Sequence, residues 1–302
     1  MAGNSSRGLA LAVTYGVVIL SPQGADAGVR VAIVASAEVS SSDPRFVDVR
    51  NKLASTGFFD DIGVYNALLG TPTPEELEQY DSLLVWSNQD FADPVLLGDT
   101  LADYVDRGGG VVVSIFACTT STYSRYLAGR WLAEGYGILP VGGGTLSSGG
   151  MRELGSIRVP GHPILEGVRQ FRGGAASFRP ASEDLAPDGI LVAQWSDDST
   201  LVATSDRFRH RVDLGMYPPS NAVLPTLWDQ NTDGARLMAN ALVYAARCRP
   251  DINHDGHVDF FDYLDFVDAF ERGDDAADFD RNGTVDFFDY LDFLPALDAG
   301  CD

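Results

Sequence analysis

Short apolar runs alternate with amphipathic stretches along the first half of the chain. Four runs (VRVAIVA, DIGVYNA, SLLVWS and GVVVSIFA) have the length and composition of buried strands. They predict strands at 29–35, 61–67, 82–87 and 110–117. The stretches between and after them predict helices at 46–55, 74–80, 94–108 and 124–134. This alternation is typical of α/β proteins, in which helices cover both faces of a parallel sheet.

The second half of the chain has more strand character. The segments GSIRV, ILVAQWS, LVATSD and RHRVDLGM predict four further strands, and a final amphipathic helix is expected at 233–246. We therefore predict one doubly wound, mostly parallel α/β domain at 28–248. Its length of about 220 residues suffices for a single core.

The last part of the chain contains an exact repeat. The octapeptide DFFDYLDF occupies 259–266 and again 286–293. Each copy follows an acidic segment with one glycine, DINHDGHV at 251–258 and DFDRNGTV at 278–285. Oxygen-bearing side chains at alternate positions, with glycine at position 6, are the pattern of a calcium loop.

Counting from the first aspartate of each segment gives two twelve-residue loops in the same register. A hard cation takes six to eight oxygens, and position 7 supplies only its backbone carbonyl. We predict two Ca²⁺ ions, held by the residues at positions 1, 3, 5, 7, 9 and 12. These are Asp251, Asn253, Asp255, His257, Asp259 and Asp262 in the first loop, and Asp278, Asp280, Asn282, Thr284, Asp286 and Asp289 in the second. The alternative is a solvated acidic tail without order.

Both loops have aspartate at position 12 and lack a convincing preceding helix. This loop-then-helix duplication resembles dockerin modules over about 250–302, and we expect a small helical, EF-hand-like module at 249–302. The resemblance implies a cohesin-like or other protein partner, recognised partly through positions 10 and 11. Those positions are Phe260, Phe261, Phe287 and Phe288 rather than the usual small hydroxyl residues. We expect at least one phenylalanine of each pair to be buried.

The charge of the chain is concentrated in this tail. The net charge is −22, and residues 251–302 hold 16 acids and two arginines, hence −14, which leaves −8 for the first 250 residues. Two calcium ions would reduce the repulsion, so the tail is expected to fold with metal and to loosen without it. The negative charge argues against a nucleic-acid partner.

The amino terminus predicts export. Arg7 precedes the apolar run LALAVTYGVVIL, and ADA at 25–27 has the small residues of a cleavage site. We therefore predict a signal peptide at 1–27 and a mature protein that is secreted or held at the cell surface. A buried helix or retained anchor is the alternative. No segment is long enough for a membrane span. Cys248 and Cys301 bracket the module and are expected to form a disulfide in an oxidising compartment; two free thiols are the alternative.

The larger domain resembles the class I glutamine-amidotransferase-like superfamily, within it the ThuA-like branch. The resemblance rests on segments at 80–94, 101–114, 162–168 and 234–246. It implies a flavodoxin-like fold and says little about chemistry. Cys118 lies in FACTTST without the flanking glycines of a nucleophile elbow, and only His162 and His210 are available as bases. The catalytic residues, if there are any, are therefore unknown.

Ligands of open parallel sheets bind outside the carboxyl ends of the strands. That rule gives a candidate crevice, suited to a hydroxyl-rich ligand such as a carbohydrate, although ordinary loop polarity would look the same. Its residues are Ser36, Asn88, Gln89, Asp90, Thr119, Thr120 and Arg125.

The sequence as a whole predicts a secreted protein whose α/β domain lacks amidotransferase catalysis and whose calcium module serves attachment or assembly in extracellular carbohydrate-related systems. One alternative is a ThuA-like enzyme that acts on a sugar or glycoside and is delivered by the module. Another is a tail that only stabilises the chain. Exposed phenylalanines would favour docking, and buried ones would favour the stabiliser.

Overall fold

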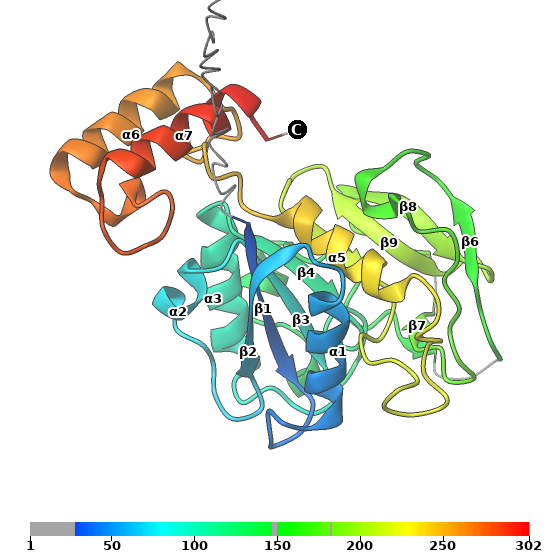
Figure 1. Ribbon diagram of the computed structural model, residues 1–302. Coiled ribbons are helices and arrows are strands. Elements are labelled where there is room, and N and C mark those ends of the chain that lie inside the picture. Colours follow the sequence, from blue (N-terminus) through cyan, green and yellow to red (C-terminus); the bar gives the residue numbers. More distant parts are fainter. Residues whose placement is uncertain (1–27, 147–149, 182, 302) are drawn as a thin grey trace, which may run out of the picture.

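A computed structural model describes residues 28–146, 150–181 and 183–301. The expected signal peptide at 1–27 lies outside these residues. Eight strands form one large sheet (Figure 1). In spatial order they are β2 (Phe59–Asn66), β1 (Val29–Ser36), β3 (Ser82–Ser87), β4 (Gly110–Ser114), β10 (Arg211–Leu214), β9 (Thr200–Ser205), β8 (Gly189–Trp195) and β6 (Leu154–Ile157). β5 (Thr145–Leu146) pairs separately with β7 (Arg179–Pro180).

The first five strands of this order are parallel, and the remaining three are antiparallel. The order β2-β1-β3-β4-β10 is that of flavodoxin-like sheets, with β10 in the place of the fifth parallel strand. β3 and β4 are buried along their whole length, as their unbroken apolar sequences predict. The prediction of an α/β domain with a large, mostly parallel sheet is confirmed.

Helices cover both faces of the parallel half (Figure 1). α1 (Pro44–Ala54) and α5 (Gly234–Ala245) lie on one face, and α2 (Pro74–Glu78) and α3 (Pro94–Asp106) lie on the other. The residue at which a helix begins is set by capping side chains, as α3 shows. Asp93 caps α3, because its carboxylate accepts from two backbone N–H groups of the first turn, and a proline follows at the first helical position.

The helix predicted at 124–134 is largely absent. Its place is taken by a 3₁₀ turn, η1 (Tyr123–Arg125), and a single turn of helix, α4 (Arg130–Ala133). Gly129 lies between them with φ of +59°, which a continuous helix does not allow. A second 3₁₀ turn, η2 (Pro163–Leu165), packs beside α5.

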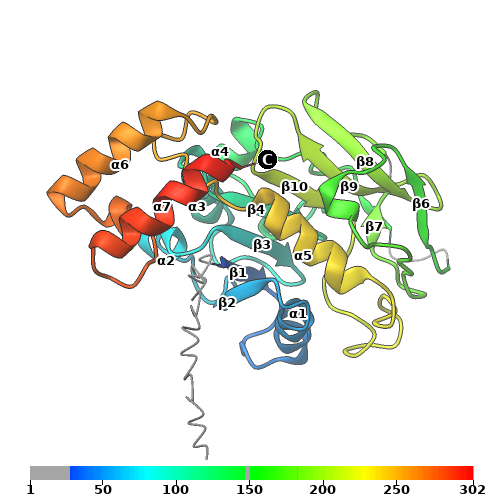
Figure 2. The same cartoon turned by 45° about the horizontal axis from the view of Figure 1, so that its top comes forward.

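The C-terminal module, which we define as residues 249–301, consists of α6 (Phe260–Arg272), the 3₁₀ turn η3 (Asp275–Ala277) and α7 (Phe287–Ala299). The two long helices lie side by side above the α/β domain (Figures 1 and 2). Phe266 of α6 stacks on Phe293 of α7 with ring centroids 3.9 Å apart, and both side chains are fully buried. The module thus has a small apolar core of its own, separate from that of the sheet.

Within the described part of the chain, every helix is too short or too polar to cross a lipid bilayer.

Candidate metal centre

The two acidic segments before α6 and α7 have the same backbone geometry. Position 6 of each is a glycine with φ of +84°, Gly256 and Gly283. Position 4 also has a positive φ, 58° at both His254 and Arg281, which is unusual for residues with side chains. Two segments 27 residues apart therefore curl in the same way, as the repeat in the sequence predicts.

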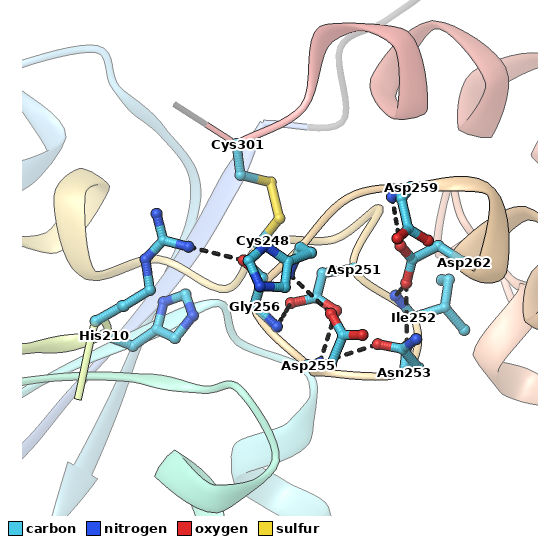
Figure 3. Close-up of a disulfide and its surroundings, with 12 residues drawn as sticks. His210, Cys248, Asp251, Ile252, Asn253, Asp255, Gly256, Asp259, Asp262 and Cys301 are labelled. Carbon is cyan, nitrogen blue, oxygen red and sulfur yellow. Dashed lines mark hydrogen bonds between the residues drawn. A yellow bond between two sulfur atoms is a disulfide. The ribbon is translucent and has the colours of Figure 1, made fainter. Parts of the chain in front are cut away.

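In the first loop, carboxylates turn inward and accept bonds from the backbone (Figure 3). The Asp251 carboxylate accepts from the N–H of Asp255 at 3.1 Å and from that of Gly256 at 2.9 Å. The side-chain oxygen of Asn253 accepts from Asp255 N–H at 2.9 Å. Asp262, at position 12, reaches back from the first turn of α6 and accepts from Ile252 N–H at 2.8 Å.

The second loop repeats these bonds. The Asp278 carboxylate accepts from Asn282 N–H at 3.1 Å and from Gly283 N–H at 2.9 Å. Asp289 accepts from Asp280 N–H at 3.0 Å, and the corresponding bond in the first loop runs from Asn253 N–H to Asp262 at 3.3 Å. Oxygens of Asp278, Asp280 and Asp289 lie within 4.8 Å of one another, close enough to share one cation.

The fit to a cation follows from the burial of the acids at position 12. Asp262 and Asp289 are fully buried, and Asp251 is only 4% exposed. Among the described residues, none of the three forms an ion pair with a cationic side chain. A buried carboxylate without a positive partner is costly, even when backbone N–H groups satisfy part of its acceptor capacity. A hard divalent cation bound by these oxygens would supply the missing charge.

The acids at positions 9 and 12 also begin the helices. Asp259 and Asp286 are the N-caps of α6 and α7, and each forms a capping box with the aspartate three residues on. Loop shape and helix start are therefore set by the same carboxylates.

A disulfide closes the module. Cys248 precedes the first loop, Cys301 follows α7, and their sulfurs are bonded, with Cα atoms 5.6 Å apart (Figure 3). The two ends of the module are thereby held together at the point where the chain leaves the α/β domain.

Both loops contact the α/β domain, which sequence reasoning did not anticipate. The Arg281 guanidinium, at position 4 of the second loop, binds the Asp81 carboxylate through bonds of 2.5 and 3.2 Å. In the first loop, Arg209 donates to the carbonyl of Gly256 at 2.7 Å. Arg249, in the connection, stacks on Phe279, and burial lowers the pKa of this guanidinium to about 10.

The phenylalanine pairs at positions 10 and 11 point to solvent. Phe260, Phe261, Phe287 and Phe288 are 63–65% exposed, so the expectation that one of each pair would be buried is wrong. Asp262 and Asp289 occupy the inward side of the first helical turn instead, and the buried aromatic of each helix lies four residues later, at Phe266 and Phe293.

The structure gathers five of the seven candidate crevice residues at the carboxyl ends of β1 and β3. Ser36 is buried and its hydroxyl donates to the carbonyl of Asp90 at 2.6 Å. The backbone N–H groups of Asn88 and Gln89 both donate to the carbonyl of Ser36. Arg125 lies 3.4 Å from the Asp90 carboxylate. Much of this polarity therefore serves bonds within the crevice itself.

The other two crevice residues, Thr119 and Thr120, follow β4, and the Thr119 side chain points toward β5 and away from the other five. Its hydroxyl is buried and lies 2.5 Å from that of Thr145 in β5. Thr120 remains partly exposed beside it, and its hydroxyl accepts from Thr122 N–H at 3.2 Å. Within the described residues, neither hydroxyl forms a hydrogen bond with the five crevice residues at the ends of β1 and β3.

Among the described residues, neither histidine of the domain forms a hydrogen bond or ring contact with Cys118. Cys118 follows the carboxyl end of β4, whereas His210 directly precedes β10, which runs parallel to β4. The Nδ1 atom of His210 lies 3.2 Å from the carbonyl oxygen of Ala245. The His162 ring contacts that of Tyr244, near the end of α5. The carbonyl of Ala245, the last residue of α5, lies close to Gly110 at the amino end of β4. Burial raises the pKa of the Cys118 thiol well above its usual range, which disfavours the thiolate.

Solved structures with a similar fold include ThuA-like proteins. A ThuA-like protein from Bacteroides uniformis aligns with a TM-score of 0.51 at 14% identity, over 78% of this chain and 95% of its own. A cytoplasmic protein from Salmonella typhimurium aligns with a TM-score of 0.52 at 13% identity, over 72% of this chain and 100% of its own. The α/β domain thus has the fold of ThuA-like proteins, as its sequence resemblance implied.

No family model matches the sequence, and no curated protein matches it either.

Proposed function

We propose that this is a secreted protein in which a C-terminal two-calcium, dockerin-like module attaches a ThuA-like α/β domain to a partner. The attachment serves assembly in an extracellular, carbohydrate-related system, a setting inferred from the resemblance to dockerins. The α/β domain is noncatalytic in the amidotransferase sense.

The calcium assignment is carried by one observation: two buried carboxylates, Asp262 and Asp289, each close an oxygen-rich loop and form no ion pair with a cationic side chain among the described residues. The ligands would be the six loop residues predicted for each ion. Calcium would neutralise these acids and hold each loop to the first turn of the following helix.

Docking is favoured over a purely internal role by the exposed phenylalanines. A tail that only stabilised the chain would turn its large apolar side chains toward its own core or toward the α/β domain. Instead, four of them are more than 60% exposed, together with Leu264 and Leu291 at 45%. Three of these side chains lie at the start of each helix, and exposed apolar patches of this kind mark interaction surfaces in soluble proteins.

The noncatalytic assignment is supported by the positions of Cys118 and the two histidines. A cysteine nucleophile needs a base within hydrogen-bond reach. The His210 ring bonds to the carbonyl of Ala245, and His162 accepts from the N–H of Ile164, so among the described residues neither ring is hydrogen-bonded to Cys118. Among the described residues, no contact in the candidate crevice favours the enzyme alternative, a ThuA-like enzyme acting on a sugar.

Calcium titration of the full chain by calorimetry, after chelation, tests the proposal. We expect two bound ions and a gain of helical circular dichroism on binding. Asp289→Asn should reduce the stoichiometry to one ion. Glu271→Gln removes the same charge from an exposed position on α6 and should leave it at two.

An absence of calcium uptake at millimolar concentration would refute the metal assignment. An equal loss of bound calcium in Asp289→Asn and Glu271→Gln would also refute it, because calcium uptake would then depend on overall charge and not on the loop carboxylate.

A further inference from the structure

A groove lies where the start of α6 meets the end of α7. Its volume is about 560 Å³. Apolar side chains make up most of the lining, from Phe260 and Tyr263 of α6 and from Leu294 and Leu297 of α7. The carboxylates of Asp259 and Asp298 lie at the same site. The groove therefore combines an apolar surface with negative charge.

The repeat provides an internal comparison for this groove. At the opposite end of the helix pair, Phe287 and Tyr290 correspond to Phe260 and Tyr263, and the phenylalanines are equally exposed. The other side differs, because Leu294, Leu297 and Asp298 correspond by the 27-residue offset to Val267, Phe270 and Glu271. The two ends thus share their phenylalanine but not the residues opposite it.

The charge around the groove is not neutralised from within the module. Of its arginines, Arg281 pairs with Asp81, Arg272 pairs with Asp268, and Arg249 is mostly buried against Phe279. Residues 251–302 carry −14, which two Ca²⁺ ions would reduce to −10. Asp259 belongs to the first loop, so Asp298 is the carboxylate left for a partner.

We propose that this groove binds a partner protein through a segment that carries both apolar and basic side chains. Leucine-like side chains would cover Phe260 and its neighbours, and a lysine or arginine would pair with Asp298. The inference deepens the proposed attachment function and rests on it. A second copy of this chain does not fit, since each copy carries −22 and would bring like charges together. An uncharged polysaccharide would make no use of the acidic rim.

A synthetic amphipathic peptide of leucine and lysine is the probe, labelled for fluorescence anisotropy and titrated with the calcium-loaded full chain. We expect binding that weakens as sodium chloride is raised. Phe260→Ser should weaken binding about tenfold, the loss typical of a central apolar contact. Phe287→Ser, the matched control at the other end, should change binding less than about twofold. Asp298→Asn should weaken binding and reduce its salt dependence.

Calcium uptake of each variant is measured first, which separates the two proposals. Normal uptake with no peptide binding overturns the groove assignment alone, whereas absent uptake overturns the proposed metal function. Equal losses for Phe260→Ser and Phe287→Ser, or equal binding of a leucine–glutamate peptide, also overturn the groove assignment. Competition by soluble xylan would point to a polysaccharide ligand, and a dimer in sedimentation would point to self-association; either result would refute the proposal.

Discussion

The contact between Arg281 and Asp81 makes the strongest quantitative prediction. Arg281 donates to both carboxylate oxygens of Asp81 and, at 3.3 Å, to the carbonyl of Gln79. The Asp81 side chain is 3% exposed and that of Arg281 is 19% exposed. The pair thus joins the second loop of the module to the loop before β3 in a largely dry environment.

Arg281→Met keeps much of the aliphatic packing and removes the charge. Loss of one partner from a buried pair costs about 3–5 kcal/mol, because the other charge stays buried. Asp81 retains the bond from Arg30 N–H at 2.8 Å, and Arg281 is not fully buried. We therefore expect a smaller loss of about 2–3 kcal/mol in the free energy that holds the module in place.

Hydrogen-exchange mass spectrometry of the calcium-loaded chain measures this loss directly. The opening free energy of amides in the second loop and α7 should fall by the same amount, about 2–3 kcal/mol. Arg272→Met is the matched control, since Arg272 is exposed and pairs with exposed Asp268, a contact worth about 0.5 kcal/mol or less. In a cycle with Asp81→Asn, the two changes should be strongly non-additive. Additive effects, or an equal loss in Arg272→Met, would refute this reasoning.

Three further predictions concern the disulfide, a histidine and the free thiol. Cys301→Ala should lower the unfolding free energy of the module by about 4 kcal/mol, from the 53-residue separation of the bonded cysteines; an unchanged urea transition would contradict the closed-loop account. Burial lowers the pKa of His162 from its ordinary 6.5, and its Nδ1 accepts from Ile164 N–H at 3.2 Å, so the folded state favours the neutral ring. The contribution of the neutral His162 ring to stability is present above pH 6.5 and is lost as the pH falls toward the lower pKa of the folded state. The unfolding free energy measured in urea should therefore fall more steeply between pH 7 and 5 in the parent chain than in His162→Asn. Parallel curves would argue against this role. Cys118, 4% exposed and with its pKa raised by burial, should react with Ellman's reagent only on unfolding, and fast reaction of the native chain would show that the thiol is accessible.

The parallel half of the sheet was readable from the sequence because its signals are local. The run SLLVWS is β3 to the residue, and GVVVSIFA begins where β4 begins. The place of β10 was not readable, because it joins the sheet beside β4 after a long antiparallel excursion. The prediction of one helix at 124–134 was wrong, because Gly129 has a positive φ that interrupts the helix and that the apolar periodicity does not reveal.

At the candidate metal centre, the order of the loop residues was predictable from the sequence, but the contacts of the loops with the rest of the chain were not. The alternation of oxygens from Asp251 and from Asp278 predicts two loops of one shape, and the loops do have matching φ angles and hydrogen bonds. The pairing of Arg281 with Asp81 joins residues 200 positions apart, and position 4 of a loop carries no signal for it. The burial of the phenylalanines was misjudged because apolar character alone does not tell which side of a first helical turn faces inward.

The loops connect the two properties on which the proposed function depends. The same segments that would bind calcium contain Arg281 and Gly256, which contact the α/β domain, and they begin the helices that display Phe260 and Phe287. In the proposed calcium-bound state, the ions would therefore fix both how the groove is shaped and how it is oriented relative to the sheet. On this proposal, loss of calcium would act on both at once, because a loop released from its cation would loosen both the helix start and the contact with Asp81. Attachment through this module would then be confined to surroundings that keep the loops loaded.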